Sequence, residues 1–175
     1  MHDQDEVRRR AATILRSAGI AVTADEAAGI EVTDFGLGQH GQSGLQLLIY
    51  VNDARYCAKE MVVFGGQTCP EHLHPPFDGT PGKQETLRVR AGTVYLYVPG
   101  EPTPDPVARP YRPEHYTVWH ELTLRPGDQY TIPPMTKHWF HAPDTAIVSE
   151  FSTQSRDEFD RFTDPEIVRV GDPMG

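Results

Sequence analysis

Hydrophobic residues near the start of the chain recur every three or four positions, which is the period of an amphipathic α-helix. The pattern predicts a helix over residues 4–18, with its apolar positions at Val7, Ala11, Ile14, Leu15 and Ala18. Thr23 and Glu26 have the spacing of a capping box, in which each side chain bonds the backbone N–H of the other residue. They predict the start of a short second helix that ends near Gly29.

From residue 45 onward the period changes, and short runs rich in Val, Ile, Tyr, Thr and Leu are separated by Gly and Pro clusters. Such runs predict β-strands, at Leu45–Val51, Tyr56–Phe64, Glu85–Arg90, Thr93–Val98, Tyr116–Leu124, Gln129–Ile132 and Ala146–Ser152. The 15 Gly and 16 Pro among 175 residues exceed the average and fit many turns. Many short strands with turns between them predict an all-β sandwich or barrel.

The length of 175 residues is typical of one domain. We expect a single domain over residues 1–175, in which residues 1–30 form a helical N-terminal decoration and residues 153–175 an irregular tail. At most one helical turn is expected in that tail, around Asp157–Arg161. The Pro-rich stretch Glu101–Pro113 predicts a long loop that is too short to separate domains.

The charge balance excludes several classes of partner. The 16 Lys and Arg against 25 Asp and Glu give a net charge of −9, whereas nucleic acids and anionic membranes require a basic surface. The most apolar run, Leu45–Val51, is far shorter than the roughly 20 residues of a membrane-spanning helix, and the charged N-terminus is unlike a signal peptide. Cys57 and Cys69 form no CxxC pair, which indicates a cytoplasmic protein with reduced thiols; one disulfide is the alternative.

Three histidines and one glutamate form the most informative group in the chain. His72 and His74 are two residues apart, so on a strand their side chains point to the same face. Glu85 begins the next predicted strand, and His138 follows a Pro-Pro turn after another. Three imidazole nitrogens and one carboxylate oxygen converging inside a small barrel make a binding site for a divalent transition metal. The alternative for His-x-His alone is a pair of hydrogen-bonded loop residues.

The spacing of this group resembles the two motifs of the cupin superfamily. The first string is Gly66, His72, His74, Glu85 and Gly92, and the second is Gly127, Pro133 and His138. The resemblance implies a double-sheet jelly roll with a metal at its centre. Three departures are visible: a ten-residue segment, Pro75–Gln84, separates the His pair from the Glu, Met135 stands where the family has Gly, and Ala142 where it has Asn. The metal set itself is intact.

A narrower resemblance covers most of the chain. Residues 44–97, 114–142 and 162–165 closely resemble bacterial D-lyxose isomerases, and the likeness extends over roughly residues 32–167. Its most specific parts are the His-Pro-Pro insertion that ends in Gly-Lys-Gln-Glu and the run Pro-Pro-Met-Thr-Lys-His-Trp. The resemblance implies a manganese-dependent, dimeric, cytoplasmic ketol-isomerase that acts on D-lyxose and often on D-mannose.

Aldose–ketose isomerisation also needs a group that moves a proton between two carbons. Glu150 is the leading candidate, because it lies among apolar strand residues, where burial raises the pKa of a carboxyl group unless a cation compensates. Lys83, two residues before Glu85, can stabilise negative charge on the sugar oxygens. Asp160 and Asp164 are weaker acid–base candidates. The alternatives are that Glu150 is a salt-bridged residue at a sheet edge, that Lys83 is a solvated loop lysine, and that the two aspartates are ordinary turn residues.

Some side chains near these motifs have two readings. Cys69 is either a soft metal ligand or a small buried hydrophobe, and Trp139 either lines the pocket or packs in the core. Of Lys59 and Glu60, adjacent on one strand, only one can face inward, and the sequence does not say which. Glu71 points away from the His pair if its strand is regular.

The function expected from these features is a metal-dependent isomerase that interconverts D-lyxose and D-xylulose, with D-mannose and D-fructose as a second pair. Mn²⁺ is the expected cofactor, with Fe²⁺, Co²⁺ and Zn²⁺ as alternatives. A free sugar is the expected substrate, and a second copy of the chain the expected partner. Two rival functions use the same ligands: a cupin dioxygenase with Fe²⁺, and a sugar-binding cupin without catalysis.

Overall fold

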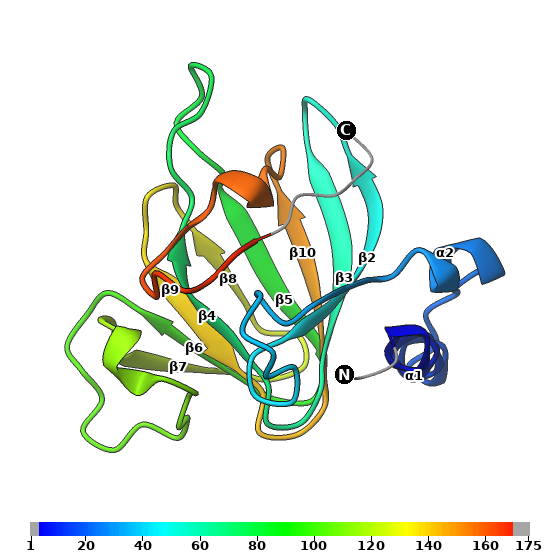
Figure 1. Cartoon of the computed structure of the whole chain (residues 1–175), viewed down its shortest axis with the longest axis horizontal. Coiled ribbons are helices and arrows are strands. Elements are labelled where there is room, and N and C mark those ends of the chain that lie inside the picture. Colours follow the sequence, from blue (N-terminus) through cyan, green and yellow to red (C-terminus); the bar gives the residue numbers. More distant parts are fainter. Residues whose placement is uncertain (1–3, 170–175) are drawn as a thin grey trace.

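The computed structural model describes residues 4–169 and shows two N-terminal helices followed by two antiparallel sheets (Figure 1). The helices are α1 (Gln4–Ser17) and α2 (Ala24–Ala28). The strands are β1 (Glu31–Thr33), β2 (Leu45–Asn52), β3 (Cys57–Val63), β4 (Thr68–Leu73), β5 (Glu85–Ala91), β6 (Val94–Val98), β7 (His120–Leu124), β8 (Gln129–Ile132), β9 (His138–His141), β10 (Ala146–Ser152) and β11 (Arg161–Phe162).

The two sheets face each other and enclose the main hydrophobic core. The first sheet has the order β1-β2-β3-β10-β5-β8 and the second β11-β4-β9-β6-β7, so that neighbouring strands come from distant parts of the chain. Met61, Val89 and Val148 of the first sheet contribute to one cluster with Leu96 and Phe140 of the second. This double-sheet jelly roll confirms the predicted fold class.

Strand β10 lies in the middle of the first sheet and pairs with both β3 and β5. Glu150 on β10 is directly opposite Lys59 on one side and Leu87 on the other. The register of β10 therefore decides which side chains of three strands share the barrel interior.

Helix α1 covers part of the outer face of the first sheet (Figure 1). Its apolar stripe, which includes Ala11 and Leu15, packs against Leu48, Val62 and Ile147 in a second cluster. Both hydrogen bonds of the capping box predicted at the start of α2 are present. No helix in the described part of the chain is long and apolar enough to cross a membrane.

An aromatic cluster covers the outer face of the second sheet. Tyr97 and Trp139 stack with ring centroids 3.7 Å apart, and Tyr116 meets Trp139 edge-on at 4.6 Å. The Pro-rich loop that was predicted after β6 lies over this cluster and contributes the buried Ala108, whose N–H donates to the Tyr97 hydroxyl.

Two parts of the strand prediction were wrong. Strand β7 begins at His120 and not at Tyr116, because the N–H groups of Thr117 and Val118 donate to the carboxylate of Glu71 (2.6 and 2.9 Å) and not to a neighbouring strand. Four observed strands were missing from the predicted list: β1 and β11, whose three and two residues are too few for a periodic pattern, and β4 and β9, which the sequence indicated only through the histidines that they carry.

The C-terminal tail is more ordered than the sequence predicted. The expected helical turn is present as a 3₁₀ turn at Asp157–Phe159. The next residues form β11, which pairs with β4 next to the predicted metal ligand His72. Residues 170–175, the end of the predicted irregular tail, lie outside the described residues.

Candidate metal centre and active site

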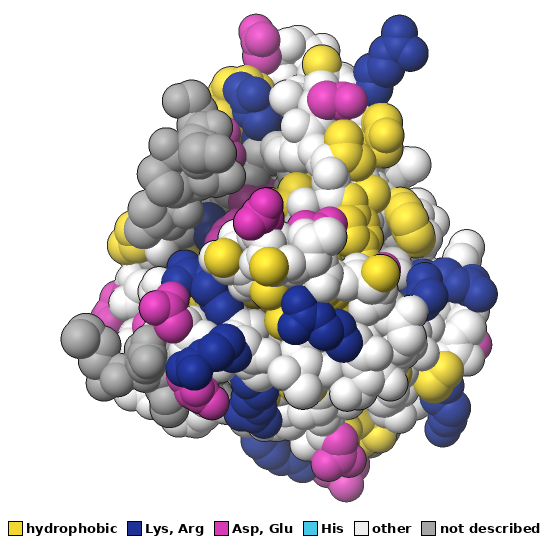
Figure 2. Space-filling model, turned by 90° about the vertical axis from the view of Figure 1, so that its right-hand side faces the viewer, with side chains coloured by type: hydrophobic (Ala, Val, Ile, Leu, Met, Phe, Trp, Pro, Cys, Tyr) yellow, Lys and Arg dark blue, Asp and Glu magenta, His cyan; other side chains and the backbone are white. Residues whose placement is uncertain are grey.

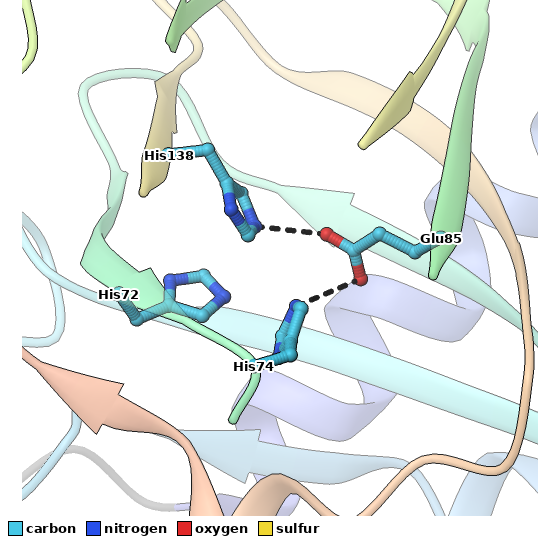
Figure 3. A group of neighbouring side chains, drawn as sticks. All are labelled: His72, His74, Glu85 and His138. Atoms are coloured by element: carbon cyan, nitrogen blue, oxygen red, sulfur yellow. Dashed lines mark ion pairs between the residues drawn. The ribbon is translucent and has the colours of Figure 1, made fainter. Parts of the chain in front are cut away.

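The four predicted metal ligands meet at one point inside the barrel (Figure 3). His72 lies near the end of β4, His74 directly follows that strand, Glu85 opens β5 and His138 opens β9. One ligand atom of each lies within 4.8 Å of the others, and all four side chains are buried. The geometry could hold a metal ion.

Strand register and one glycine explain this convergence. His72 and His138 are directly opposite each other on β4 and β9. The ten-residue insertion returns the chain from His74 to Glu85 through Gly82, which has a φ of +98°. A Cβ at Gly82 would lie 2.5 Å from the carbonyl oxygen of His74, so any other residue would displace the loop that joins these two ligands.

A hydrogen bond at Nδ1 of each imidazole fixes the orientation of the ring. Nδ1 of His72 lies 2.8 Å from the carbonyl oxygen of Pro70, and Nδ1 of His138 lies 2.9 Å from that of Thr136. Nδ1 of His74 lies 2.6 Å from the Asp160 carboxylate. Since these partners accept, each Nδ1 carries a proton, which leaves Nε2 as the atom that can bind a metal, as in histidine metal ligands.

The environment of the Nε2 atoms is consistent with a bound cation at this point. The Nε2 atoms of His74 and His138 are buried without a hydrogen bond, although they lie 3.4 and 2.9 Å from the oxygens of Glu85. Burial and Lys83 oppose a proton on His74, yet Glu85 and Asp160 raise its pKa to about 9. The electrostatic potential at the site therefore favours positive charge, and the donor set fits a divalent metal.

The charge of the surrounding side chains agrees with this fit. Two ammonium groups face four carboxylates, which leaves a formal charge of −2 when the imidazoles are neutral; these residues are Lys59, Lys83, Glu85, Glu150, Asp157 and Asp160. Arg169 pairs with Glu31 and adds nothing to this sum. A divalent cation would neutralise the group.

Glu150 and Lys83, the predicted catalytic pair, lie beside the candidate metal centre. The Lys83 ammonium is 2.7 Å from Glu85 and 3.1 Å from Oε1 of Glu150. Lys59 contacts the same oxygen at 3.4 Å, so Oε2 of Glu150 has neither ammonium as a partner. Although burial opposes it, Lys83 and His74 hold the pKa of Glu85 well below its usual value, so Glu85 is a carboxylate.

The two aspartates predicted as weaker candidates lie in different places. Asp160 reaches the site through its bond to His74, whereas Asp164 binds Arg112 at 2.7 Å and receives the N–H of Glu166, away from the metal ligands. Asp164 is thus the turn residue that the alternative described.

Sequence reasoning missed one carboxylate and left one lysine undecided. Asp157, on the 3₁₀ turn of the tail, binds Lys59 at 3.2 Å and Arg169 at 3.2 Å. Lys59 proves to be the inward-facing member of its pair, while Glu60 points to the outer face and accepts from Ser149. No local pattern marks Asp157, because its contacts exist only when the tail crosses the barrel mouth.

A cavity at the centre is lined by these charged groups on one side and by core residues on the other. A second cavity of about 310 Å³ shares Lys83 and Asp160 with it and lies between the β2–β3 turn, the 75–84 insertion and the tail. The second cavity reaches the candidate metal ligand His74, which is one of its lining residues. Phe77 of the insertion stacks on Phe159 of the tail at 4.0 Å beside this cavity.

The structure shows where three further side chains lie for which the sequence had left the orientation or role open. Cys69 lines the central cavity, but burial raises the pKa of its thiol well above the usual value, so it stays a neutral hydrophobe outside the ligand group. Trp139 faces the aromatic cluster on the outer side and does not line the pocket, because it alternates with the inward His138. Glu71 points away from the His pair, as expected.

Met135, where the cupin pattern has Gly, adopts a backbone conformation that favours glycine. Its φ is +61°, in the left-handed region that costs a residue with a Cβ roughly 1–2 kcal/mol. The Met135 N–H donates to the carbonyl oxygen of His74 at 3.1 Å, which ties the Pro-Pro turn to a candidate ligand.

Fold and site together define a cupin-type jelly roll with a buried three-histidine, one-glutamate centre. Among solved structures, the L-ribose isomerase of Acinetobacter sp. DL28 in complex with L-ribose aligns with a TM-score of 0.79 and 20% identity over 93% of this chain and 92% of that one. The ligand-free L-ribose isomerase of Cellulomonas parahominis gives the same values. At this identity the likeness establishes the fold.

The sequence relatives are much closer. The D-lyxose/D-mannose isomerase of Thermosediminibacter oceani is 58% identical over 168 residues, which are 94% of this chain and 93% of that protein. A D-lyxose ketol-isomerase of Thermofilum sp. is 59% identical over the same shares. No family model matches the chain. The chain belongs to the D-lyxose ketol-isomerase family and is a sugar isomerase.

Proposed function

We propose that this protein interconverts D-lyxose and D-xylulose with a divalent metal held by His72, His74, Glu85 and His138. The observation that carries the proposal is the position of Glu150, a buried carboxylate with one oxygen held by two lysines, beside a complete metal-ligand set. Relatives named for this reaction cover nearly the whole chain. D-mannose and D-fructose are proposed as a second pair, since the relative from Thermosediminibacter oceani is named for D-mannose as well as D-lyxose.

The reaction moves one proton between C1 and C2 and another between O1 and O2. The metal, when bound, supplies Lewis-acid stabilisation of the negative charge that develops on adjacent sugar oxygens. Oε2 of Glu150 takes the carbon proton from C2 of the aldose and returns it to C1, because Oε1 is held by Lys59 and Lys83. A single base on one side of the sugar can serve both half-reactions.

Lys83 assists by its charge. Its ammonium lies between Glu85 and Glu150, so it reaches both the candidate metal ligand and the proposed base. From there it stabilises negative charge on the sugar oxygens and can carry the proton between O1 and O2. Asp160, which we expected to act on the substrate, is proposed to act through His74: it holds the ring so that Nε2 faces the metal.

Mn²⁺ is the proposed ion. Three neutral nitrogens and one carboxylate leave positions free on a six-coordinate ion for two sugar oxygens, whereas structural Zn²⁺ prefers a closed tetrahedron of ligands. The formal charge of −2 around the site supports a divalent ion.

A homodimer in the cytoplasm is proposed as the working form. Ile49, Tyr50, Tyr56 and Phe151 expose between 37% and 51% of their surfaces along β2, its turn and β10, beyond the reach of α1. Figure 2 shows exposed hydrophobic side chains on this side of the molecule, which a second copy could cover. The two cysteines are buried and unpaired, in keeping with a reducing compartment.

The test is turnover of purified, metal-stripped protein on D-lyxose and D-mannose, with ketose formation measured before and after Mn²⁺ is added. We expect metal-dependent formation of D-xylulose. Glu150→Gln should retain metal and bind the sugar while kcat falls by about 10²–10⁴-fold, the usual contribution of a general base.

One control variant and two further assays complete the test. Asp164→Asn removes the charge of a buried carboxylate that is remote from the ligands, and it should leave turnover unchanged. Absence of ketose from any pentose or hexose in metal-loaded protein would contradict the proposal. Oxygen uptake with Fe²⁺ would then indicate a dioxygenase, and sugar binding without turnover would indicate a binding protein.

A further inference from the structure

Lys59 is a buried cation that metal binding and proton transfer do not by themselves require. It lies in the middle of β3 with 3% of its surface exposed, between the inward-facing Cys57 and Met61. Removing an ammonium group from water is costly unless partners of opposite charge are well placed around it. The identity of the partners of Lys59 therefore decides what its charge does.

The partners of Lys59 place it behind the proposed base. Its Nζ lies 3.4 Å from Oε1 of Glu150, 3.2 Å from Oδ2 of Asp157 and 3.3 Å from the Ser155 hydroxyl. Lys59 and Glu150 are directly opposite each other in the β3–β10 ladder, so the sheet itself fixes their separation.

Lys59 differs from Lys83 in what else it contacts. Lys83 binds Glu150 and also the candidate metal ligand Glu85, so its removal disturbs the base and the metal together. Within residues 4–169, none of the ion pairs of Lys59 involves a candidate metal ligand. Lys59 contacts the proposed base directly, and its link to Lys83 runs through Asp157, which lies 3.6 Å from the Lys83 ammonium.

Asp157 anchors Lys59 to the tail. Although burial opposes it, the charges of Lys59 and Lys83 hold the pKa of Asp157 well below its usual value, so this residue is a carboxylate. It accepts a hydrogen bond from Ser155 and binds Arg169. The ammonium is thereby held between the base and the 3₁₀ turn that crosses the barrel mouth.

We propose that Lys59 is the positioning residue of the base: it holds Oε1 of Glu150 against β3 so that Oε2 faces the substrate carbon. The inference rests on the proposed role of Glu150. The charged and titratable groups around that carboxylate are Lys59 and Cys57 on β3, Lys83 before β5 and Asp157 on the tail.

The test is Lys59→Met, compared with wild-type protein for Mn²⁺ content, kcat and KM for D-lyxose. We expect kcat to fall about 10- to 100-fold with metal content and KM unchanged, since misplacing a catalytic group by 1 Å can cost 10²-fold. Lys59→Arg should recover most of kcat.

The matched control is Glu60→Gln, which changes the next residue of the same strand on the opposite face and should leave kcat unchanged. If Lys59→Met does not fold, Asp157→Asn and Lys59→Arg decide: the first loosens the ammonium and should lower kcat without changing KM, and the second should preserve kcat.

Three results would overturn the role of Lys59 while wild-type turnover is normal. They are an unchanged kcat, a raised KM at unchanged kcat, which would make Lys59 a substrate contact, and a loss of metal in Lys59→Met. Absence of turnover in the wild-type protein would overturn the proposed function itself, and the role of Lys59 with it.

Discussion

The two faces of strands β3 and β10 carry adjacent buried polar pairs with different consequences. On the inner face Lys59 is opposite Glu150, and on the outer face Glu60 is opposite Ser149, one residue along each strand. All four side chains are at least nine-tenths buried. The inner pair belongs to a network that includes the 75–84 insertion, the tail and the candidate metal ligands, whereas Ser149 is the only hydrogen-bond partner recorded for the Glu60 side chain within residues 4–169.

The comparison of these two pairs shows that burial of a charged residue alone does not indicate function. The Glu60–Ser149 pair lies beside the apolar cluster under α1. Burial of the Glu60 carboxylate there destabilises the fold, and the hydrogen bond from the Ser149 hydroxyl offsets this only in part. The Glu150 pair lies where several chain segments supply opposite charges around a cavity. Convergence of charges from distant segments, more than burial, marks the candidate active site.

The largest effect is expected on the inner face, from Glu85→Gln. This change removes the anionic ligand and the partner of Lys83, so bound Mn²⁺ should be lost and turnover should fall by about 10³-fold or more. Metal analysis after gel filtration and a ketose assay measure both. Glu71→Gln changes another buried glutamate, one that points away from the ligands, and it should keep the metal; metal retained by Glu85→Gln would contradict the ligand set.

A smaller effect is expected from Asp160→Ala, which frees Nδ1 of His74. Loss of such a partner typically weakens metal affinity by about 10–100-fold, and we expect this at constant kcat once Mn²⁺ saturates. Calorimetric titration with Mn²⁺ measures it. Asp160→Asn, which can still accept the bond, should recover most of the affinity. Equal Mn²⁺ affinity in Asp160→Ala and the wild type would show that the bond to Asp160 does not orient His74.

The smallest effect is expected on the outer face, from Glu60→Gln. Burial raises the pKa of Glu60, so the folded state binds its proton more tightly than the unfolded chain and stability falls as pH rises through the raised pKa. Glu60→Gln should therefore raise the Tm at pH 8 by about 2–4 °C, the change that about 1 kcal/mol produces in a domain of this size, and have little effect near pH 3, below the ordinary pKa of a glutamate, where the carboxyl group is protonated in both states. Melting curves at the two pH values measure this, and a lower Tm than wild type at pH 8 would contradict it.

The fold class and the candidate ligands could be predicted from the sequence alone. Strand period, turn residues and an apolar helical stripe are local features that predicted an all-β sandwich or barrel and α1, and the resemblance to the cupin motifs narrowed this to a jelly roll. The side of the strand shared by His72 and His74 followed from their spacing of two. The roles of Glu85 and His138 as candidate ligands followed from the resemblance to the two cupin motifs.

Which charged side chains surround the four candidate metal ligands could be seen only in the tertiary structure. The choice between Lys59 and Glu60 depended on the register of β3 with β10, because apolar residues occupy both faces of that strand. The positions of Asp157 and Asp160 depended on a tail that returns across the barrel mouth, many residues after the strands it contacts. Contacts between distant segments are set by packing of the whole chain, and no local pattern encodes them.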